Sequence, residues 1–454
     1  MDERIHEEGN RSMKRTTVVA LTFVLTVLII AGCSSNNGSN SNSGNQKGLK
    51  QDTSENVSTQ DADGDAAKPV PAEQVTIKLL SPFGAELSEK RYRPIEKMLP
   101  NIKLEIIEGK LEELHAQNIV PDIVVTGWGF SQYEKESSEP LDDLIKKHQF
   151  DLGALNSSLV ASERASDKEN RLMSLPNSND VVVMYYNKTV FDKFGVSYPT
   201  DSMTWDDMID AAKQMTAERE GVKYRGLEMR SEIGFGLQQF GVNLTDPATG
   251  DVLFAKDPRV IKYFELLKKI YSIPGMAEDA DPFGPFLEGK VGMLLTSAQY
   301  MRWAVPADLA ARIDFAAAPV WADNPGTTMV SRSYSHNMIN KYSEHKDEAF
   351  QVLAAYYSPE IQTMLTRGAE EVTPLTDQDI QAQFGADLPN FQGKNVKAIF
   401  MYTPAKPPEV ISTWDAHVNL DQGTFITSEM NIPEFLRVKT EEAQIKIKEA
   451  KGQQ

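Results

Sequence analysis

Apolar residues follow two different periods from position 74 onward, and these periods alternate along the chain. Short runs that are apolar almost throughout are typical of strands covered on both faces by helices. Between them, apolar residues recur every three or four positions, which indicates amphipathic helices. The alternation predicts an α/β fold. The expected strands are Val75–Leu80, Ile102–Ile107, Ile123–Thr126, Val181–Tyr186, Val291–Thr296 and Ile313–Ala316.

Start signals place three helices within this pattern. Thr204 and Asp207 have the spacing of a reciprocal capping box, and the apolar stripe that begins at Trp205 predicts a buried helix face. The pairs Asp257-Pro258 and Ser358-Pro359 each combine an N-cap residue with a first-turn proline. Trp205 is therefore expected to belong to the core.

The patterned part of the chain, about 380 residues, is longer than one core usually holds, so two lobes are expected. No internal repeat and no second low-complexity linker separates them. The chain is therefore expected to cross between the lobes several times.

The N-terminal segment has the features of a secretory signal. Met13-Lys14-Arg15 is basic, and Thr16 to Gly32 is uncharged and mostly apolar, a run that is short for a membrane-spanning helix. It ends in Leu28-Ile29-Ile30-Ala31-Gly32-Cys33, which resembles the bacterial lipobox, in which the cysteine carries diacylglycerol. The alternative is an uncleaved anchor helix with an incidental cysteine. We expect residues 1–32 to be a signal peptide and Cys33 to be lipidated.

Two flanking stretches refine this prediction. Residues 1–12 place acidic residues where a signal sequence requires basic ones, so we hypothesise that translation begins at Met13. Residues 33–73 follow the lipobox and are rich in Ser, Asn, Gly and Asp, without an aromatic residue. Such a composition cannot bury enough apolar area to fold, so a flexible tether is expected. The mature protein is then lipid-anchored in the cell membrane and faces the extracellular side.

Charge and composition exclude several classes of function. The formal net charge of −18 disfavours nucleic acid as a partner, because phosphate backbones would be repelled. A single cysteine excludes an internal disulfide and multi-cysteine metal sites, and the six histidines are scattered. Serine-hydrolase, P-loop and dinucleotide-binding motifs are absent from the sequence. We therefore expect neither enzymatic activity, nor a cofactor, nor a bound metal.

Several segments together resemble the family 1 extracellular solute-binding proteins, the receptors of bacterial ATP-binding-cassette importers that include maltose-binding protein. Val181 to Lys188 is similar to the family's first crossing strand, and Pro121-Asp122-Ile123-Val124 to its Pro-Asp strand. Phe286-x-x-Gly289-Lys290-Val291-Gly292-Met293 matches its glycine-bounded strand entrance, the most specific motif of the set. The resemblance covers residues 74 to about 375 well and the remainder loosely.

The resemblance implies a two-lobe periplasmic-binding-protein-like fold whose lobes are discontinuous in sequence. Residues 74–183 with 336–372 would form the first lobe, and 184–335 with 373–454 the second. It implies a monomer that captures a carbohydrate, here interpreted as an oligosaccharide, by lobe closure and delivers it to a membrane permease. The alternatives are a receptor for a peptide or polyamine, a secreted lipoprotein hydrolase, and a ligand-sensing partner of a signalling kinase.

Ligands of open α/β sheets lie at the carboxyl ends of strands and between lobes, which points to loops for the binding site. Aromatic faces pack on sugar rings, while planar polar groups satisfy hydroxyls. For each aromatic residue, core packing is the alternative. The candidate ligand-binding residues are Phe83, Trp128, Asn179, Asp180, Phe235, Gln238, Tyr300, Arg302, Ser333, Tyr334 and His336.

Arg302 raises a further hypothesis about the ligand. It occupies a position where the family resemblance leads one to expect a second stacking aromatic, and Arg332 lies beside the second crossing. A guanidinium grips a carboxylate with two hydrogen bonds, so the ligand could include an acidic sugar such as a uronate. The alternative is that Arg302 pairs with an acidic residue of the protein or binds neutral hydroxyls.

Overall fold

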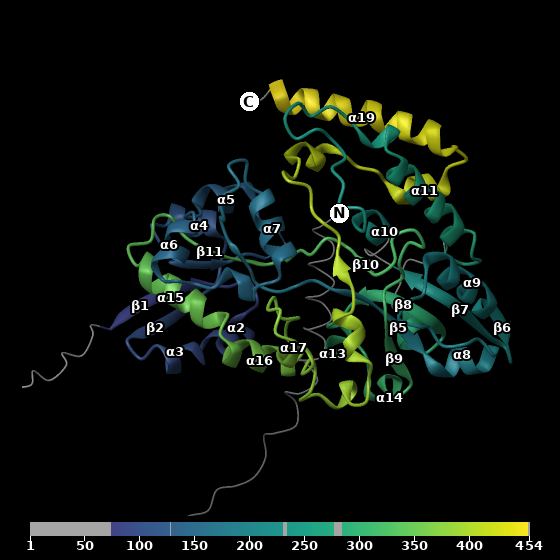
Figure 1. Cartoon of the computed structure of the whole chain (residues 1–454), viewed down its shortest axis with the longest axis horizontal. Helices are drawn as coiled ribbons and strands as arrows, with labels where there is room; N and C mark the ends of the chain where they lie inside the picture. The colour runs from purple at the N-terminus through teal and green to yellow at the C-terminus, as the bar shows by residue number, and fades with distance from the viewer. Residues whose placement is uncertain (1–73, 128, 230–233, 277–283, 453–454) are drawn as a thin grey trace, which may run out of the picture. The chain divides into compact units, whose positions relative to one another are not determined.

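Two five-stranded sheets organise the residues that this computed structural model describes, which are 74–127, 129–229, 234–276 and 284–452. The first sheet has the order β2–β1–β3–β11–β4, and Figure 1 labels its strands β1, β2 and β11. Its strands are β1 (Val75–Leu80), β2 (Ile102–Ile107), β3 (Ile123–Val125), β4 (Leu175–Pro176) and β11 (His336–Ile339). β1 pairs in parallel with β2 and β3, whereas β11 runs antiparallel to β3 and β4.

The second sheet has the order β6–β7–β8–β5–β9. Its strands are β5 (Val182–Asn187), β6 (Ala217–Arg219), β7 (Val222–Met229), β8 (Val291–Ser297) and β9 (Ile313–Ala317). β5 is antiparallel to β8 and β9, and β7 is parallel to β8. A separate parallel pair joins β10 (Thr327–Thr328) to β12 (Thr403–Pro404).

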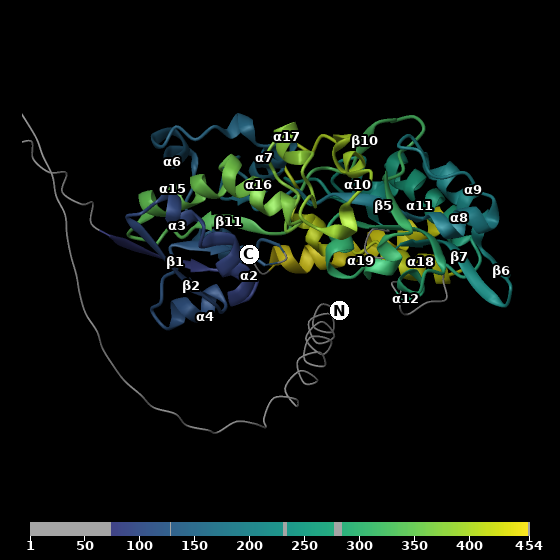
Figure 2. The same cartoon turned by 90° about the horizontal axis from the view of Figure 1, so that it is seen from below.

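Apolar clusters cover both faces of the first sheet, and the central strand β3 is accordingly buried throughout, whereas the edge strand β2 alternates buried and exposed residues. Ile77 and Leu79 of β1 point into the larger cluster with helices α3 (Ile95–Met98), α15 (Lys346–Tyr356) and α16 (Pro359–Arg367). Leu80 points the other way, toward Leu114 of α4 (Leu111–Ala116). Figure 2 shows these helices on the two sides of the strands. The period of two in a strand produces this alternation.

The second sheet is covered in the same way. Met184 and Leu227 face α8 (Lys188–Phe194) and α9 (Trp205–Met215). Val183 and Tyr185 face the opposite side, toward α13 (Tyr300–Trp303), α14 (Ala307–Ala310) and the segment from Phe384 to Phe400. A further apolar cluster joins α11 (Pro258–Tyr271), α18 (Gln422–Thr427) and α19 (Ile432–Gly452), and α19 lies beside α11 in Figure 1.

The remaining helical segments connect these elements. The α-helices are α2 (Ala85–Tyr92), α5 (Gln132–Ser137), α6 (Asp142–Lys147), α7 (Ser157–Ala165), α10 (Phe235–Gln238), α12 (Gly284–Leu287) and α17 (Gln378–Gln381). The 3₁₀ helices are η1 (Leu152–Ala154), η3 (Phe254–Lys256), η4 (Pro389–Phe391), η5 (Val396–Phe400) and η6 (Thr413–His417).

The local predictions agree closely with this architecture. All six predicted strands are present, and each boundary lies within one residue of the observed one. Thr204 and Asp207 form the expected capping box, and Asp257 and Ser358 cap α11 and α16. Trp205 is buried, as predicted. None of the described helices is long and apolar enough to cross a membrane. The predicted signal peptide, Cys33 and the tether lie outside the described residues.

Gly226 allows α9 to lie unusually close to β7. A Cβ atom at this position would lie 2.0 Å from the carbonyl oxygen of Ala212, far inside van der Waals contact. We expect Gly226→Ala to lower the free energy of unfolding by about 1–3 kcal/mol, since the helix must shift away from the strand. Denaturant titration measures this change. Gly423→Ala in α18 is the control, because its Cβ would meet only ordinary contacts, and an equal loss there would contradict the explanation.

Candidate ligand-binding site

Three segments that pass between the sheets lie side by side, and we call residues 177–181, 331–336 and 370–372 the crossing segments. The amide of Asn177 donates to the carbonyl of Ser335 at 3.0 Å, and the amide of Asp180 donates to the carbonyl of Arg332 at 2.9 Å. The amide of Asn179 donates to the carbonyl of Val372 at 2.9 Å. Backbone hydrogen bonds therefore bring several candidate residues together that are far apart in sequence.

Asp180, Arg332 and Tyr334 form the polar centre of the crossing segments. The Arg332 guanidinium carbon lies 4.5 Å from the centroid of the Tyr334 ring, and Arg332 also donates to the Tyr334 hydroxyl. Oδ2 of Asp180 and Nε of Arg332 are buried, and neither has a hydrogen-bond partner among the described residues. Buried polar atoms are rarely left unpaired in proteins, so these two atoms mark a place where a polar ligand would be favoured.

The environment of Asp180 opposes ionisation. Burial raises the pKa of this carboxyl well above its ordinary value, while the nearby Arg332 charge opposes the rise and Glu371 adds to it. The carboxyl group is therefore costly for the protein to keep charged. A ligand hydroxyl that donates to Oδ2 would stabilise the charged form.

His336 is already held by the protein on the first-sheet side of this centre. Its Nδ1 lies 2.9 Å from Oε1 of Glu163, a buried residue whose Oε2 accepts a hydrogen bond from the Ser174 hydroxyl at 2.5 Å. The ring of Phe130 stacks on the imidazole, with centroids 5.1 Å apart. Of the His336 side chain, 14% remains exposed, so any contact with a ligand would be through an edge of the ring.

Tyr300 and Arg302, which follow β8 and were candidate ligand-binding residues, both contact other parts of the protein. Tyr300 packs on the second core, with its ring centroid 6.1 Å from that of Tyr185 in an edge-on geometry. Arg302 pairs with Glu370, at 2.5 Å between Nη2 and Oε1. Pairing with an acidic residue was the alternative for Arg302 in the sequence. The exposed aromatic ring of this helix is Trp303, at 61% exposure, which the sequence did not single out.

Phe83 takes part in a buried ionic cluster near the third crossing segment. Its ring lies under Arg91, with 4.3 Å between the guanidinium carbon and the ring centroid. Arg91 is 1% exposed and lies 2.6 Å from Oε1 of Glu371. Burial raises the pKa of Glu371, and Arg91 opposes this rise. Phe83 therefore serves the packing of this cluster.

The other candidates fall into three groups. Phe235 is 1% exposed and packs beside Trp205, so its prediction as a ligand contact is wrong and core packing is its role. Ser333 is buried, where its hydroxyl donates to the Ser335 carbonyl and accepts from the Ser178 amide. Gln238 lies near the second crossing segment, since its carbonyl accepts from the Val330 amide. Trp128 lies outside the described residues.

Sequence reasoning missed the residues whose partners are distant in the chain. Arg91, Glu163, Glu370 and Glu371 carry no local motif, and each pairs with a residue brought close only by the fold. The one available signal was the adjacent pair Glu370-Glu371. Adjacent acids are common in a chain with 65 acidic residues, so this signal was weak.

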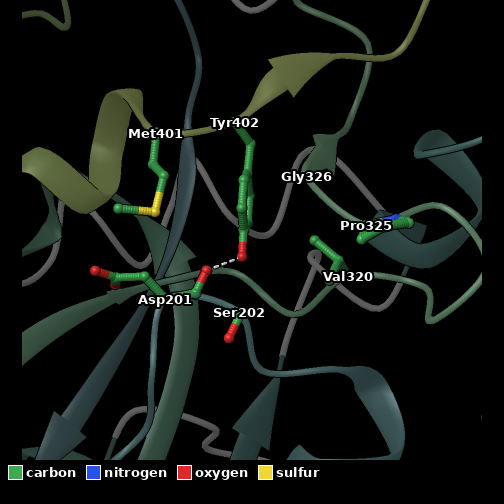
Figure 3. A pocket seen from close by; sticks show the side chains of 7 residues that line it. All are labelled: Asp201, Ser202, Val320, Pro325, Gly326, Met401 and Tyr402. Atoms are coloured by element: carbon green, nitrogen blue, oxygen red, sulfur yellow. Dashed lines mark hydrogen bonds between the residues drawn. The ribbon is translucent and has the colours of Figure 1, made fainter.

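A pocket of about 510 Å³ lies elsewhere, beside the second sheet (Figure 3). Tyr402 points across it and donates to the Asp201 carbonyl, while Met401 lies alongside. The Asp201 carboxylate already accepts from the Ala317 amide and from Asn395. The other lining residues are Ser202, Val320, Pro325 and Gly326, and none of the predicted ligand residues lines this pocket.

The chemistry available at the crossing segments is that of binding. They provide a carboxylate, a guanidinium and an aromatic face, which suit hydroxyls and the apolar face of a ring. No group of three or more His, Cys, Asp or Glu side chains in the described part of the chain is arranged to hold a metal ion.

The chain is similar in sequence to a known protein family and in fold to several solved structures. The sequence profile of the bacterial extracellular solute-binding proteins matches residues 82–363, which is more than half of the chain. The structure is similar to that of a sugar transporter from Rhizobium etli in an open conformation, with a TM-score of 0.67 and 20% sequence identity. That match covers 82% of this chain and 99% of the other.

Two further solved structures are similar in fold. One is an ATP-binding-cassette substrate-binding protein from Listeria monocytogenes in complex with cycloalternan, with a TM-score of 0.62, 19% identity, and coverage of 83% and 99% of the two chains. The other is the sugar-binding protein MalE from Xanthomonas citri, with a TM-score of 0.66, 14% identity, and coverage of 83% and 98%. These similarities confirm the predicted α/β, periplasmic-binding-protein-like fold, which the structure builds on two sheets.

Proposed function

Because this chain belongs to the bacterial extracellular solute-binding proteins, we propose that it captures a carbohydrate and delivers it to the permease of an ATP-binding-cassette importer. The family consists of binding receptors, so the prediction of a binding protein without catalytic activity is confirmed. The family resemblance noted in the sequence is confirmed as well.

The observation that carries the carbohydrate proposal is the polar centre of the crossing segments. Asp180 offers a buried acceptor and Arg332 a buried donor, both without a partner among the described residues, and Tyr334 offers an aromatic ring beside them. Sugars present hydroxyls and an apolar ring face, which suit a carboxyl group, a guanidinium group and an aromatic ring. The similar proteins support the same choice: the one from Rhizobium etli is described as a sugar transporter, the one from Listeria monocytogenes is in complex with cycloalternan, and the one from Xanthomonas citri is described as a sugar-binding protein.

We further propose that the sugar is neutral. Arg302 is paired with Glu370, and Arg91 with Glu371, so these two guanidinium groups already have carboxylate partners. Arg332 lies near the Asp180 carboxyl group, and its charge partly opposes the rise in the pKa of that group. A uronate would therefore compete with acidic residues of the protein, whereas neutral hydroxyls complete the hydrogen bonds that the protein leaves open.

Binding is proposed to occur by closure of two lobes, residues 74–183 with 336–372 and residues 184–335 with 373–454. Closure would bring the crossing segments and the loops after the strands onto the ligand. The apparent affinity is then reduced by the fraction of protein in the binding-competent form. Attachment to the membrane through Cys33 would keep the monomeric receptor beside its permease.

Two rival functions differ in their observable consequences. A receptor for a peptide or polyamine would release an amine-bearing ligand on denaturation. A sensor for a signalling kinase would bind the same sugar without supporting its uptake. Mass spectrometry of the ligand released from gently purified protein, followed by an uptake assay in a deletion strain, separates both rivals from the importer receptor.

We expect a neutral saccharide from that analysis to stabilise the protein. A ligand that binds only the folded chain contributes about 2.7 kcal/mol at one hundred times its Kd, which raises the melting midpoint by a few degrees. Calorimetry measures Kd, and chromatography of the incubated sugar checks that no product forms. The uronate of the same saccharide is the matched comparison. Equal affinity for both would contradict the neutral-sugar proposal, and turnover would contradict a receptor.

A further inference from the structure

Glu370 is surrounded by cations from two different parts of the fold. Its Oε1 lies 2.6 Å from Nζ of Lys90 and 2.5 Å from Nη2 of Arg302, and its Oε2 lies 4.0 Å from Nη2 of Arg91. Its side chain is 2% exposed, so water screens these attractions weakly. Lys90 and Arg91 end α2, whereas Arg302 belongs to α13.

The two helices belong to different cores. α2 packs on the first sheet through Tyr92, and α13 packs on the second through Met301. The main chain around Glu370 contacts both cores. Ala369 and Val372, which flank it, lie in the cluster of the second sheet, whereas Leu365 before it and Leu375 after it lie in the first cluster. Glu370 is therefore the anion at the junction of both cores.

Glu370 is one of only two carboxylates in this group of five charged side chains. Three cations, Lys90, Arg91 and Arg302, face two carboxylates, Glu370 and Glu371, and Glu371 is engaged by Arg91. Removal of the Glu370 charge would leave Arg302 of one core opposite Lys90 and Arg91 of the other. Lys90 and Arg302 are partly exposed, so their repulsion would be screened by water and salt, but the net interaction across the junction would change from attraction to repulsion.

We propose that Glu370 is a positioning residue that ties α2 to α13 and thereby sets the resting separation of the two lobes in the unliganded protein. Glu370 acts through Lys90 and Arg302 and needs no contact with the ligand. This inference rests on the two-lobe mechanism of the proposed function and deepens it. The resting separation determines how much of the protein is ready to close, and so contributes to the apparent affinity for any ligand.

The test measures distances between the lobes in the full chain without ligand. Lys97 on α3 and Gln214 on α9 are exposed and lie on helices of the first and second cores. Each is replaced by cysteine in a Cys33→Ala background, which leaves only the introduced thiols, and both are spin-labelled for pulsed dipolar spectroscopy. Distance distributions are compared for the parent, Glu370→Gln, Arg302→Gln and the double variant.

We expect Glu370→Gln to lengthen and broaden the distribution, and added salt to reverse part of the shift. Arg302→Gln should broaden the distribution without lengthening it, because it removes the tie and the repulsion together. The double variant should match Arg302→Gln. Asp387→Asn is the control, because it removes the carboxylate partner of Arg367 next to the same segment and should leave the distances unchanged.

Identical distributions in parent and Glu370→Gln would overturn the proposal. The proposal would also be overturned if the distance between the labels in the double variant were as great as in Glu370→Gln. In that case loss of Arg302 would not relieve the effect, and Glu370 would have a merely structural role. If Glu370→Gln does not fold, the proposal is tested with Arg302→Gln alone. A distance distribution equal to that of the parent would then show that Glu370 does not link α2 to α13. Because the experiment contains no ligand, failure of the protein to bind a sugar is a separate result.

Discussion

Asp180→Asn is expected to make the protein more stable at neutral pH and to weaken its ligand binding. Burial raises the folded-state pKa of this carboxyl, so the folded protein holds the proton more readily than the unfolded chain. The charged carboxylate therefore costs stability. That cost is absent when the pH is below the pKa of Asp180 in the unfolded chain, near 4. It grows as the pH rises toward the pKa of Asp180 in the folded protein.

Asparagine keeps the shape and removes this cost. We expect a gain of about 0.5–2 kcal/mol in the free energy of unfolding at neutral pH, shrinking as the pH falls toward about 4. Denaturant titrations at both pH values measure the difference between variant and parent. Glu371 also has a raised pKa, but it is present in both proteins and cancels in the comparison.

The same substitution removes a charged acceptor for the ligand. Hydrogen bonds to charged groups contribute roughly 1.5–3 kcal/mol, which corresponds to a roughly 10- to 150-fold rise in Kd by calorimetry with the saccharide released from the protein. Asp387→Asn is the matched control, since this carboxylate is half-exposed and lies outside the crossing segments. Unchanged affinity of Asp180→Asn would remove Asp180 from the site, and a loss of stability at neutral pH would refute the burial argument.

The strands could be predicted because their signal is local. Val75–Leu80 and Ile102–Ile107 alternate apolar residues with polar or charged ones before ending in an apolar pair, and both predictions match the observed strands residue for residue. Helix starts such as Thr204 depend on partners three positions away, which a single sequence displays. The two-lobe topology could be predicted only from the family resemblance. No local sequence pattern indicates that β11 lies between β3 and β4 in the sheet.

The candidate site was only partly predictable, for a different reason. Asp180 and Tyr334 could be chosen as candidates because they adjoin the crossings, and the structure places them near each other. Phe235 and Tyr300 were misleading, since an aromatic side chain after a strand can pack inward as well as face a ligand, and both pack on the second core. The ion pairs of Glu370 and Glu371 join residues separated by most of the chain, so no spacing rule could reveal them.

Cys33→Ala is expected to abolish retention of the protein on the membrane. Cys33 is the only cysteine of the 454 residues, so no other thiol could carry the diacylglycerol that the lipobox-like segment predicts. A single acyl chain binds a bilayer reversibly, with an association constant of about 10⁴ M⁻¹, whereas two chains give stable anchoring. The loss should therefore be nearly complete, with the variant recovered as precursor or in the medium.

Fractionation of cells after a high-salt wash measures this effect. A salt wash removes proteins that are held to the membrane by charge and leaves acylated proteins in place. Binding by charge would be weak for this chain, because its net charge is −18 and the membrane is anionic. Cys33→Ser is the conservative companion, because it preserves size and polarity and should fail in the same way. Retention of either variant at the level of the natural protein would contradict lipidation and favour an uncleaved anchor helix in residues 16–32.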